Sequence, residues 1–148
     1  MCDTMTENDT VRLLRECDAG ATMGADSIGD VLADVESPAM KRTLSVCKDE
    51  HDSISGEIRA RLHRCGDAGK KPGVVAEAMS RAGTWVKLQM DRSDSTIAEL
   101  MTDGCNMGVK SLSRYLNQYA AADAPSRDTA ERLIRLEAKL AEDLRGYL

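Results

Sequence analysis

Aromatic side chains are scarce in this chain of 148 residues, which contains no Phe, one Trp and three Tyr. Hydrophobic residues nevertheless make up 42% of the sequence, and eight of them are Met. Met is flexible and polarisable, so it fills irregular gaps between packed helices. A chain of this length is expected to form one domain around one core. We therefore expect a single helical domain over residues 1–148, with a core of aliphatic, thioether and small side chains.

An excess of basic residues and a long apolar run are also missing. The formal net charge is -5 and the sequence pI is about 5.1, whereas a protein that binds phosphates needs a basic face. The uncharged stretches are far shorter than the roughly 18 apolar residues of a membrane span, and the N-terminus lacks a basic region followed by an apolar one. We expect a cytoplasmic protein that binds neither nucleic acid nor membrane.

Several motifs of catalysis and cofactor binding are absent as well. The five cysteines are odd in number and irregularly spaced, unlike a disulfide framework or a CxxC metal site, so reduced thiols are expected. The glycines of GDAGKKPG at 66–73 lack the spacing of a phosphate-binding loop. With two histidines in the chain, no Ser-His-Asp or Cys-His arrangement stands out. These absences favour a non-catalytic protein over an enzyme.

Apolar residues recur at spacings of three and four, which is typical of amphipathic helices. A first helix is predicted over 9–35, with Asn8 or Asp9 as its N-cap. A second is predicted over 38–65, with Ser37 as N-cap and Pro38 in the first turn. The first inner face is Leu14, Cys17, Ala21, Gly24, Ile28, Val31 and Val35, and the second is Met40, Leu44, Cys47, His51, Ile54, Ile58 and Leu62.

Three further helices are predicted over 74–91, 95–120 and 126–147. The break before the fourth is placed at 92–96, because Thr96-x-x-Glu99 has the pattern of a capping box. In the last helix, Glu131 and Arg135 are spaced to form an ion pair. Glu137 stands at the centre of its apolar face, a position that usually faces a core. That face comprises Leu133, Ile134, Leu140, Ala141, Leu144 and Leu148.

An internal repeat links two of these segments. Residues 20–32 (GATMGADSIGDVL) and 104–116 (GCNMGVKSLSRYL) are identical at five of thirteen positions, where chance gives about one match. Convergent close packing of helices and duplication of a helical hairpin both explain the match. Duplication predicts two antiparallel hairpins joined by a crossover that carries the helix over 74–91. The Gly-x-x-x-Gly segments 20–24 and 104–108 would then face each other.

This arrangement resembles the ferritin-like four-helix bundles, and more narrowly their small bacterial members of unknown function. The residues that carry the resemblance are Gly83-x-Trp85-x-x-x-x-Met90, Ile97-Ala98-Glu99 and Asn106-Met107-Gly108. The resemblance implies an all-α antiparallel four-helix bundle of ferritin-like topology, with an extra short crossover helix between the hairpins. The Glu-x-x-His motifs of ferritin-like di-iron proteins are not present, because Glu50 is followed by Ser53 and Glu137 by Leu140.

Five residues are predicted near the middle of the bundle by counting from the loops: Met23, His51, Cys105, Met107 and Glu137. A buried imidazole and a buried carboxylate can satisfy each other by one hydrogen bond, which makes a structural pair the first interpretation. The alternative is a metal site, since thioether, thiolate and imidazole suit copper, iron or haem iron. No cofactor is expected under the first interpretation.

We therefore predict a structural or protein-interaction module that forms a homodimer or binds a protein partner, because Met-rich helical surfaces and large exposed aromatics often make such contacts. A metal- or haem-binding ferritin-like protein with a mid-bundle site is the competing hypothesis.

Overall fold

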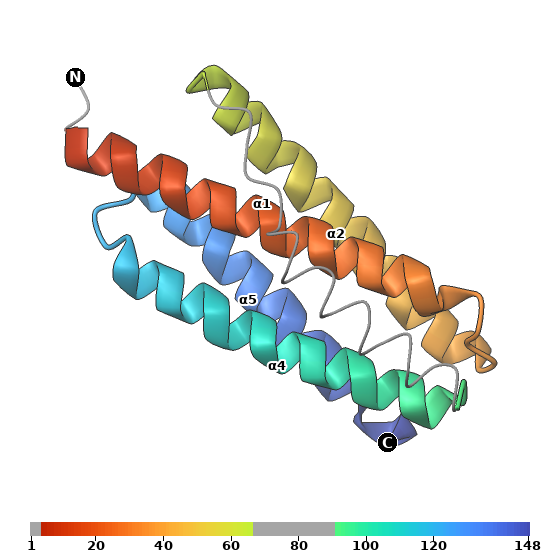
Figure 1. Cartoon of the computed structure of the whole chain (residues 1–148). Coiled ribbons are helices and arrows are strands. Elements are labelled where there is room, and N and C mark those ends of the chain that lie inside the picture. The colour runs from red at the N-terminus through yellow and green to blue at the C-terminus, as the bar shows by residue number, and fades with distance from the viewer. Residues whose placement is uncertain (1–3, 67–90) are drawn as a thin grey trace.

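A computed structural model describes residues 4–66 and 91–148 of the chain, and within these ranges the structure is helical (Figure 1). The α-helices are α1 (Thr4–Leu32), α2 (Pro38–Arg64), α4 (Asp94–Gln118) and α5 (Ala124–Leu144), and a short 3₁₀ helix, η1 (Arg145–Tyr147), follows α5. The all-α prediction is confirmed at this level. The helix predicted over 74–91, including Gly83, Trp85 and Met90, falls outside the described residues except for its last position.

The four helices form two hairpins that pack on each other. Figure 1 shows α2 returning alongside α1 and α5 returning alongside α4. Between the hairpins, α1 packs on α4 and α5, and α2 packs on α5, while α2 and α4 lie on opposite sides of the bundle. Every residue predicted on the inner face of the second helix is buried, and so is every one predicted for the first helix except Gly24, which is partly exposed.

The helix ends differ from the predicted ones because the predicted caps have other partners. Asp9 does not cap α1, which begins at Thr4; its carboxylate accepts a hydrogen bond from the backbone N–H of Ala121. The first helix also ends at Leu32 rather than at 35. Ser37 caps α2 as predicted, accepting from the backbone N–H of Met40.

The caps of the second hairpin also correct the prediction. Ser93, and not Thr96, caps α4: its side chain accepts from the backbone N–H of Thr96, whose hydroxyl donates to Asp91. Asp123 caps α5 and accepts from the N–H of Ser126, so the helix starts at Ala124, two residues before the predicted start at 126. Since α5 gives way to η1 after Leu144, the terminal Leu148 leaves the predicted apolar face and is 61% exposed.

Polar links at both ends of the bundle fix the axial position of one hairpin against the other. At one end, the carboxylate of Asp94 accepts hydrogen bonds from the backbone N–H groups of Glu36 and Ser37, at 2.8 and 2.9 Å. At the other end, the hydroxyl of Thr10 accepts from the N–H of Asp123 at 2.8 Å. These links set the height at which residues of α2 and α5 meet inside the bundle.

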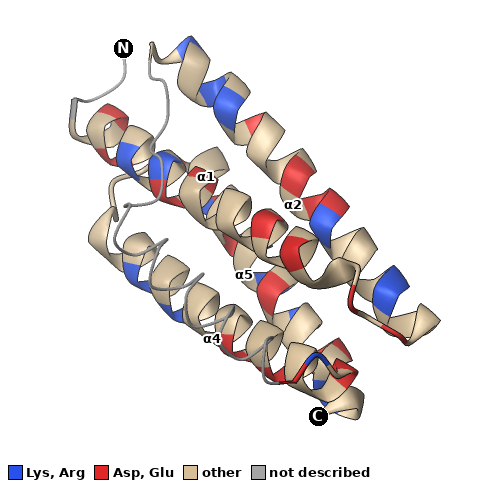
Figure 2. Ribbon diagram, turned by 45° about the vertical axis from the view of Figure 1, so that its right-hand side comes forward, with Lys and Arg blue, Asp and Glu red and all other residues tan. Residues whose placement is uncertain are grey.

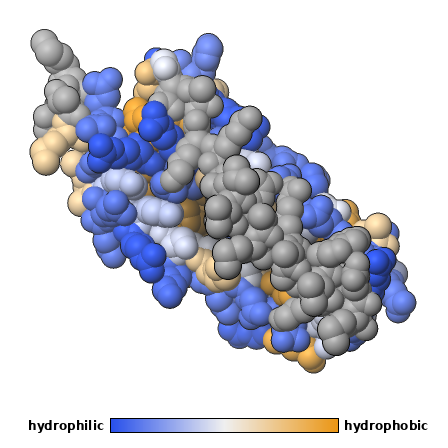
Figure 3. All heavy atoms as spheres, in the orientation of Figure 1, coloured by the Kyte–Doolittle hydropathy of each residue, from blue (hydrophilic) through white to orange (hydrophobic). Residues whose placement is uncertain are grey.

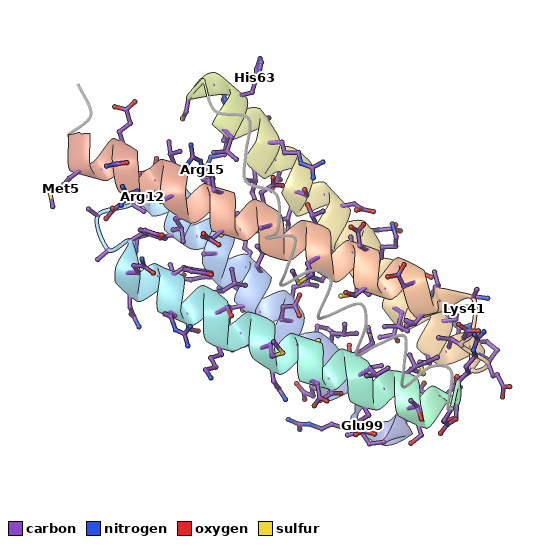
Figure 4. All side chains as sticks on the ribbon, viewed as in Figure 1. Met5, Arg12, Arg15, Lys41, His63 and Glu99 are labelled. Carbon is purple, nitrogen blue, oxygen red and sulfur yellow. The ribbon has the colours of Figure 1, made fainter. Side chains whose placement is uncertain are left out.

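The surface is polar and carries charges of both signs. Figure 2 shows basic and acidic residues interspersed along the outer side of α2, and Figure 3 shows hydrophilic residues over most of the visible part of the described surface. His63 is exposed and points away from the end of α2 (Figure 4). None of the helices in the described ranges has both the length and the apolar content that crossing a membrane requires.

Candidate functional site

A histidine of α2 and a glutamate of α5 meet in the middle of the bundle. His51 is 1% exposed and Glu137 is 9% exposed. The ring Nε2 of His51 lies 2.5 Å from Oε1 of Glu137, and its Nδ1 lies 2.8 Å from the backbone carbonyl oxygen of Cys47. A carbonyl oxygen only accepts, so Nδ1–H is the donor to Cys47. Both nitrogens of the buried ring therefore have protein partners, and the predicted contact between these two residues is formed.

The contact is an ion pair. Burial disfavours the charged ring and lowers the pKa of His51, but the hydrogen bonds to Cys47 and Glu137 and the negative charge of Glu137 outweigh it and raise the pKa to about 10. Near neutral pH the imidazolium donates from Nδ1 to the carbonyl and from Nε2 to the carboxylate. Hydrogen bonds between charged partners are short and strong, which accounts for the short distance between Nε2 and Oε1.

Two buried thiols flank this pair. The Sγ atom of Cys47 lies 3.5 Å from Nδ1 of His51. On α4, Cys105 is 3% exposed; burial, the charge of Glu137 and a hydrogen bond with the Glu137 side chain raise the pKa of its thiol. In the absence of a metal ion, Cys105 is therefore a neutral thiol beside the carboxylate.

A glycine of α1 makes room for the pair, and a glycine of α4 lies beside it. A Cβ atom at Gly24 would lie 2.7 Å from both Cδ2 and Nε2 of His51 and 3.4 Å from Oε1 of Glu137. A Cβ atom at Gly108 would lie 3.4 Å from Oε2 of Glu137. The second glycine of each Gly-x-x-x-Gly segment thus faces one oxygen of the same carboxylate, while Gly20 and Gly104 are exposed and face no described atom within 4 Å.

The other predicted site residues do not all join this cluster. Cys105 does, as described above. Met107 is 69% exposed, and Met23 is partly buried next to Gly24 in sequence. Within residues 4–66 and 91–148, no three His, Cys, Asp or Glu side chains are arranged to hold a metal ion. The metal site built on His51, Glu137, Met23, Met107 and Cys105 stays a prediction. Met107, however, points to the surface and not into the interior of the bundle.

Cys47 is the member of the cluster that was not singled out as a site residue. The signal for it was in the sequence, because Cys47 and His51 lie four residues apart on the same predicted inner face. Residues at this spacing are neighbours on a helix, and here the carbonyl of Cys47 orients the imidazole.

Comparison with known proteins does not assign the chain to a family. No protein-family model, no curated protein and no solved structure matches the chain. The resemblance to ferritin-like bundles therefore stays a prediction that depends on the quoted residues.

Replacing Gly24 by Ala should destabilise the protein by about 2 kcal/mol or more, because the added methyl group overlaps an imidazole ring that hydrogen bonds hold on both sides. Gly20→Ala is the matched control on the same helix. It should stabilise the protein by about 0.5–1 kcal/mol, since Ala favours a helix over Gly and nothing described lies near it. Urea unfolding of the two variants measures both free energies, and an equal response to the two substitutions would show that His51 does not require the space at Gly24.

Stability should fall with alkaline pH in a way that depends on His51. The folded-state pKa of about 10 lies above the unfolded value of roughly 6.5, so the contribution of His51 is complete below about pH 6.5 and is lost as the pH rises through about 10. Between these limits the unfolding free energy of the native protein should fall more steeply than that of His51→Gln, by about 1.4 kcal/mol per pH unit. Urea unfolding at a series of pH values tests this, and parallel curves for the two proteins would argue against a protonated His51.

Proposed function

We propose that this protein is a non-catalytic structural or protein-interaction module, built as an antiparallel four-helix bundle of ferritin-like topology, and that it acts as a homodimer. The observation that carries the proposal is the closed His51–Glu137 pair. A catalytic acid or base must reach a proton on its substrate. Both ring nitrogens of His51 are instead engaged by protein atoms, and the carboxylate oxygens of Glu137 face Gly24 and Gly108.

The topology proposal is supported by the order and pairing of the helices. Two hairpins with short turns, separated by a long stretch between Arg64 and Asp94, match the expected pattern of ferritin-like folds with one crossover connection. Gly24 and Gly108 occupy equivalent positions of the internal repeat and approach the same carboxylate. This correspondence favours duplication of a hairpin as the origin of the repeat.

Exposed apolar residues support a role in binding other proteins. Met107 on α4 is 69% exposed and Val46 on α2 is 56% exposed. Met adapts its shape to a partner and is frequent at interfaces. We propose that such residues, and not the buried pair, contribute to association.

The test separates the fold from the association. Sizing of the purified full chain at micromolar concentration should give a dimer, and His51→Leu combined with Glu137→Met should leave the dimer intact. The single change His51→Ala should destabilise the fold by about 3–5 kcal/mol, because it strands a buried carboxylate. In the double variant the loss should be smaller, since an apolar pair replaces the ion pair. A monomer at all concentrations tested would contradict the module acting as a homodimer.

A metal- or haem-binding protein is the second proposal, and one observation favours it. Nδ1 of His51 is anchored on a backbone carbonyl, the arrangement that commonly orients metal-binding imidazoles. Binding through Nε2, Glu137 and Cys105 would require an ion to displace the proton between His51 and Glu137. Protein purified without chelator should then contain stoichiometric iron or copper, or show haem absorbance, and lose it in His51→Ala and Glu137→Ala. Metal-free protein that stays free of metal on titration would exclude this function.

A further inference from the structure

A groove of about 340 Å³ runs between α2 and α5 on the outside of the bundle. Its lining includes Ile54 and Leu136, which are 5% and 9% exposed. Glu50 and Ser53 complete the side formed by α2, and Arg132, Arg135 and Lys139 the side formed by α5. The volume is in the range of ligand-sized clefts. Neither His51 nor Glu137 lines the groove, so it is separate from the buried pair.

One guanidinium on the basic side of the groove has no partner within residues 4–66 and 91–148. Arg132 donates to Glu57 at 2.8 Å and Lys139 donates to Asp143 at 2.7 Å, and these two pairs stand toward the two ends of the basic row. Arg135, between them, makes no hydrogen bond or ion pair with any residue of the described ranges. The predicted pair between Arg135 and Glu131 is not formed, and the Arg135 side chain lines the groove instead.

The paired cations do not close the groove to an anion. Both pairs are largely exposed, and exposed pairs contribute little to stability. Arg132 uses one of its N–H donors on Glu57, and Lys139 uses one on Asp143, so both keep donors that are free. The α5 side of the groove therefore offers three cations against one carboxylate, Glu50, on the α2 side near Lys139. Arg135, which has no partner among the described residues, stands at the centre of the row, beside the small exposed parts of Ile54 and Leu136.

We propose that this groove binds an acidic amphipathic helix from a protein partner. This inference rests on the proposed interaction function and names the chemistry of the partner. An apolar side chain would cover Ile54 and Leu136, and a carboxylate would accept two hydrogen bonds from Arg135, the planar geometry that a guanidinium favours. From Arg132 to Lys139 the wall is about 10 Å long, or two helical turns. An amphipathic helix lying in an apolar groove is a recurring mode of peptide recognition.

The test uses the full chain and a synthetic helical peptide of about three turns, roughly 11 residues, with Leu on one face and Glu beside it. A second peptide has Gln in place of every Glu. Fluorescence anisotropy should show binding of the Glu peptide that weakens with added salt, and little binding of the Gln peptide. Arg135→Glu should weaken binding about tenfold or more, while Arg42→Glu, an exposed position of α2 outside the groove, should leave it unchanged. Circular dichroism of both variants checks that they fold.

The outcomes separate this inference from the proposed function. Binding that survives Arg135→Glu overturns the groove as the site and leaves an interaction module with another surface. Failure of the native protein to bind the Glu peptide overturns the groove, and the dimer measured by sizing then decides the module by itself. If Arg135→Glu abolishes self-association, a second copy of this chain occupies the groove and the partner proposed here is wrong.

Discussion

A single buried carboxylate organises the interior of this bundle. Glu137 of α5 accepts from His51 of α2, interacts with Cys105 of α4 and lies against Gly24 of α1, so it touches all three other helices. An ionised carboxylate away from water is stable only when charged or hydrogen-bonding partners surround it. The helices must therefore assemble at one axial height and one rotation. The end links through Asp94 and Thr10 impose the same height from outside.

The buried ring explains one glycine of the repeat. A Cβ atom at Gly24 would overlap the His51 imidazole, whereas one at Gly108 would make an ordinary van der Waals contact with Glu137. Gly20 and Gly104, four residues earlier in each segment, are at the surface. Within the described residues, Gly24 is therefore the position of the repeat at which the buried pair requires a glycine. The helices can pack in this one arrangement because the polar partners of the pair and the space left by glycine occur together. A buried polar pair without space, or space without the pair, would destabilise the bundle.

The spacing of apolar residues predicted which faces are buried, whereas height along a helix alone did not predict which way a side chain points. Leu44, Cys47, His51 and Ile54 repeat at three and four residues, and this spacing by itself defines one buried face. Met107 was placed by its height along the helix. It stands two residues beyond Cys105, about 200° around the axis, and therefore points outward. Caps were also missed where long-range contacts decide them: Asp9 has the chemistry of an N-cap, but the backbone of Ala121 uses it. Local preference cannot reveal such a partner, because it lies more than a hundred residues away in the chain.

The interior and the surface of the bundle differ in the groups that they offer to another molecule. Both ring nitrogens of His51 and the carboxylate of Glu137 already have partners, so this pair has no group left to recognise another molecule. The outer side of α5 is different. Arg135 could have paired with Glu131 within its own helix, yet it lines the groove with Leu136 and Ile54 and has no partner among the described residues. Recognition requires groups whose hydrogen bonds are not yet made. In the described part of this bundle, the unpaired guanidinium beside an apolar surface meets that requirement and the buried ion pair does not.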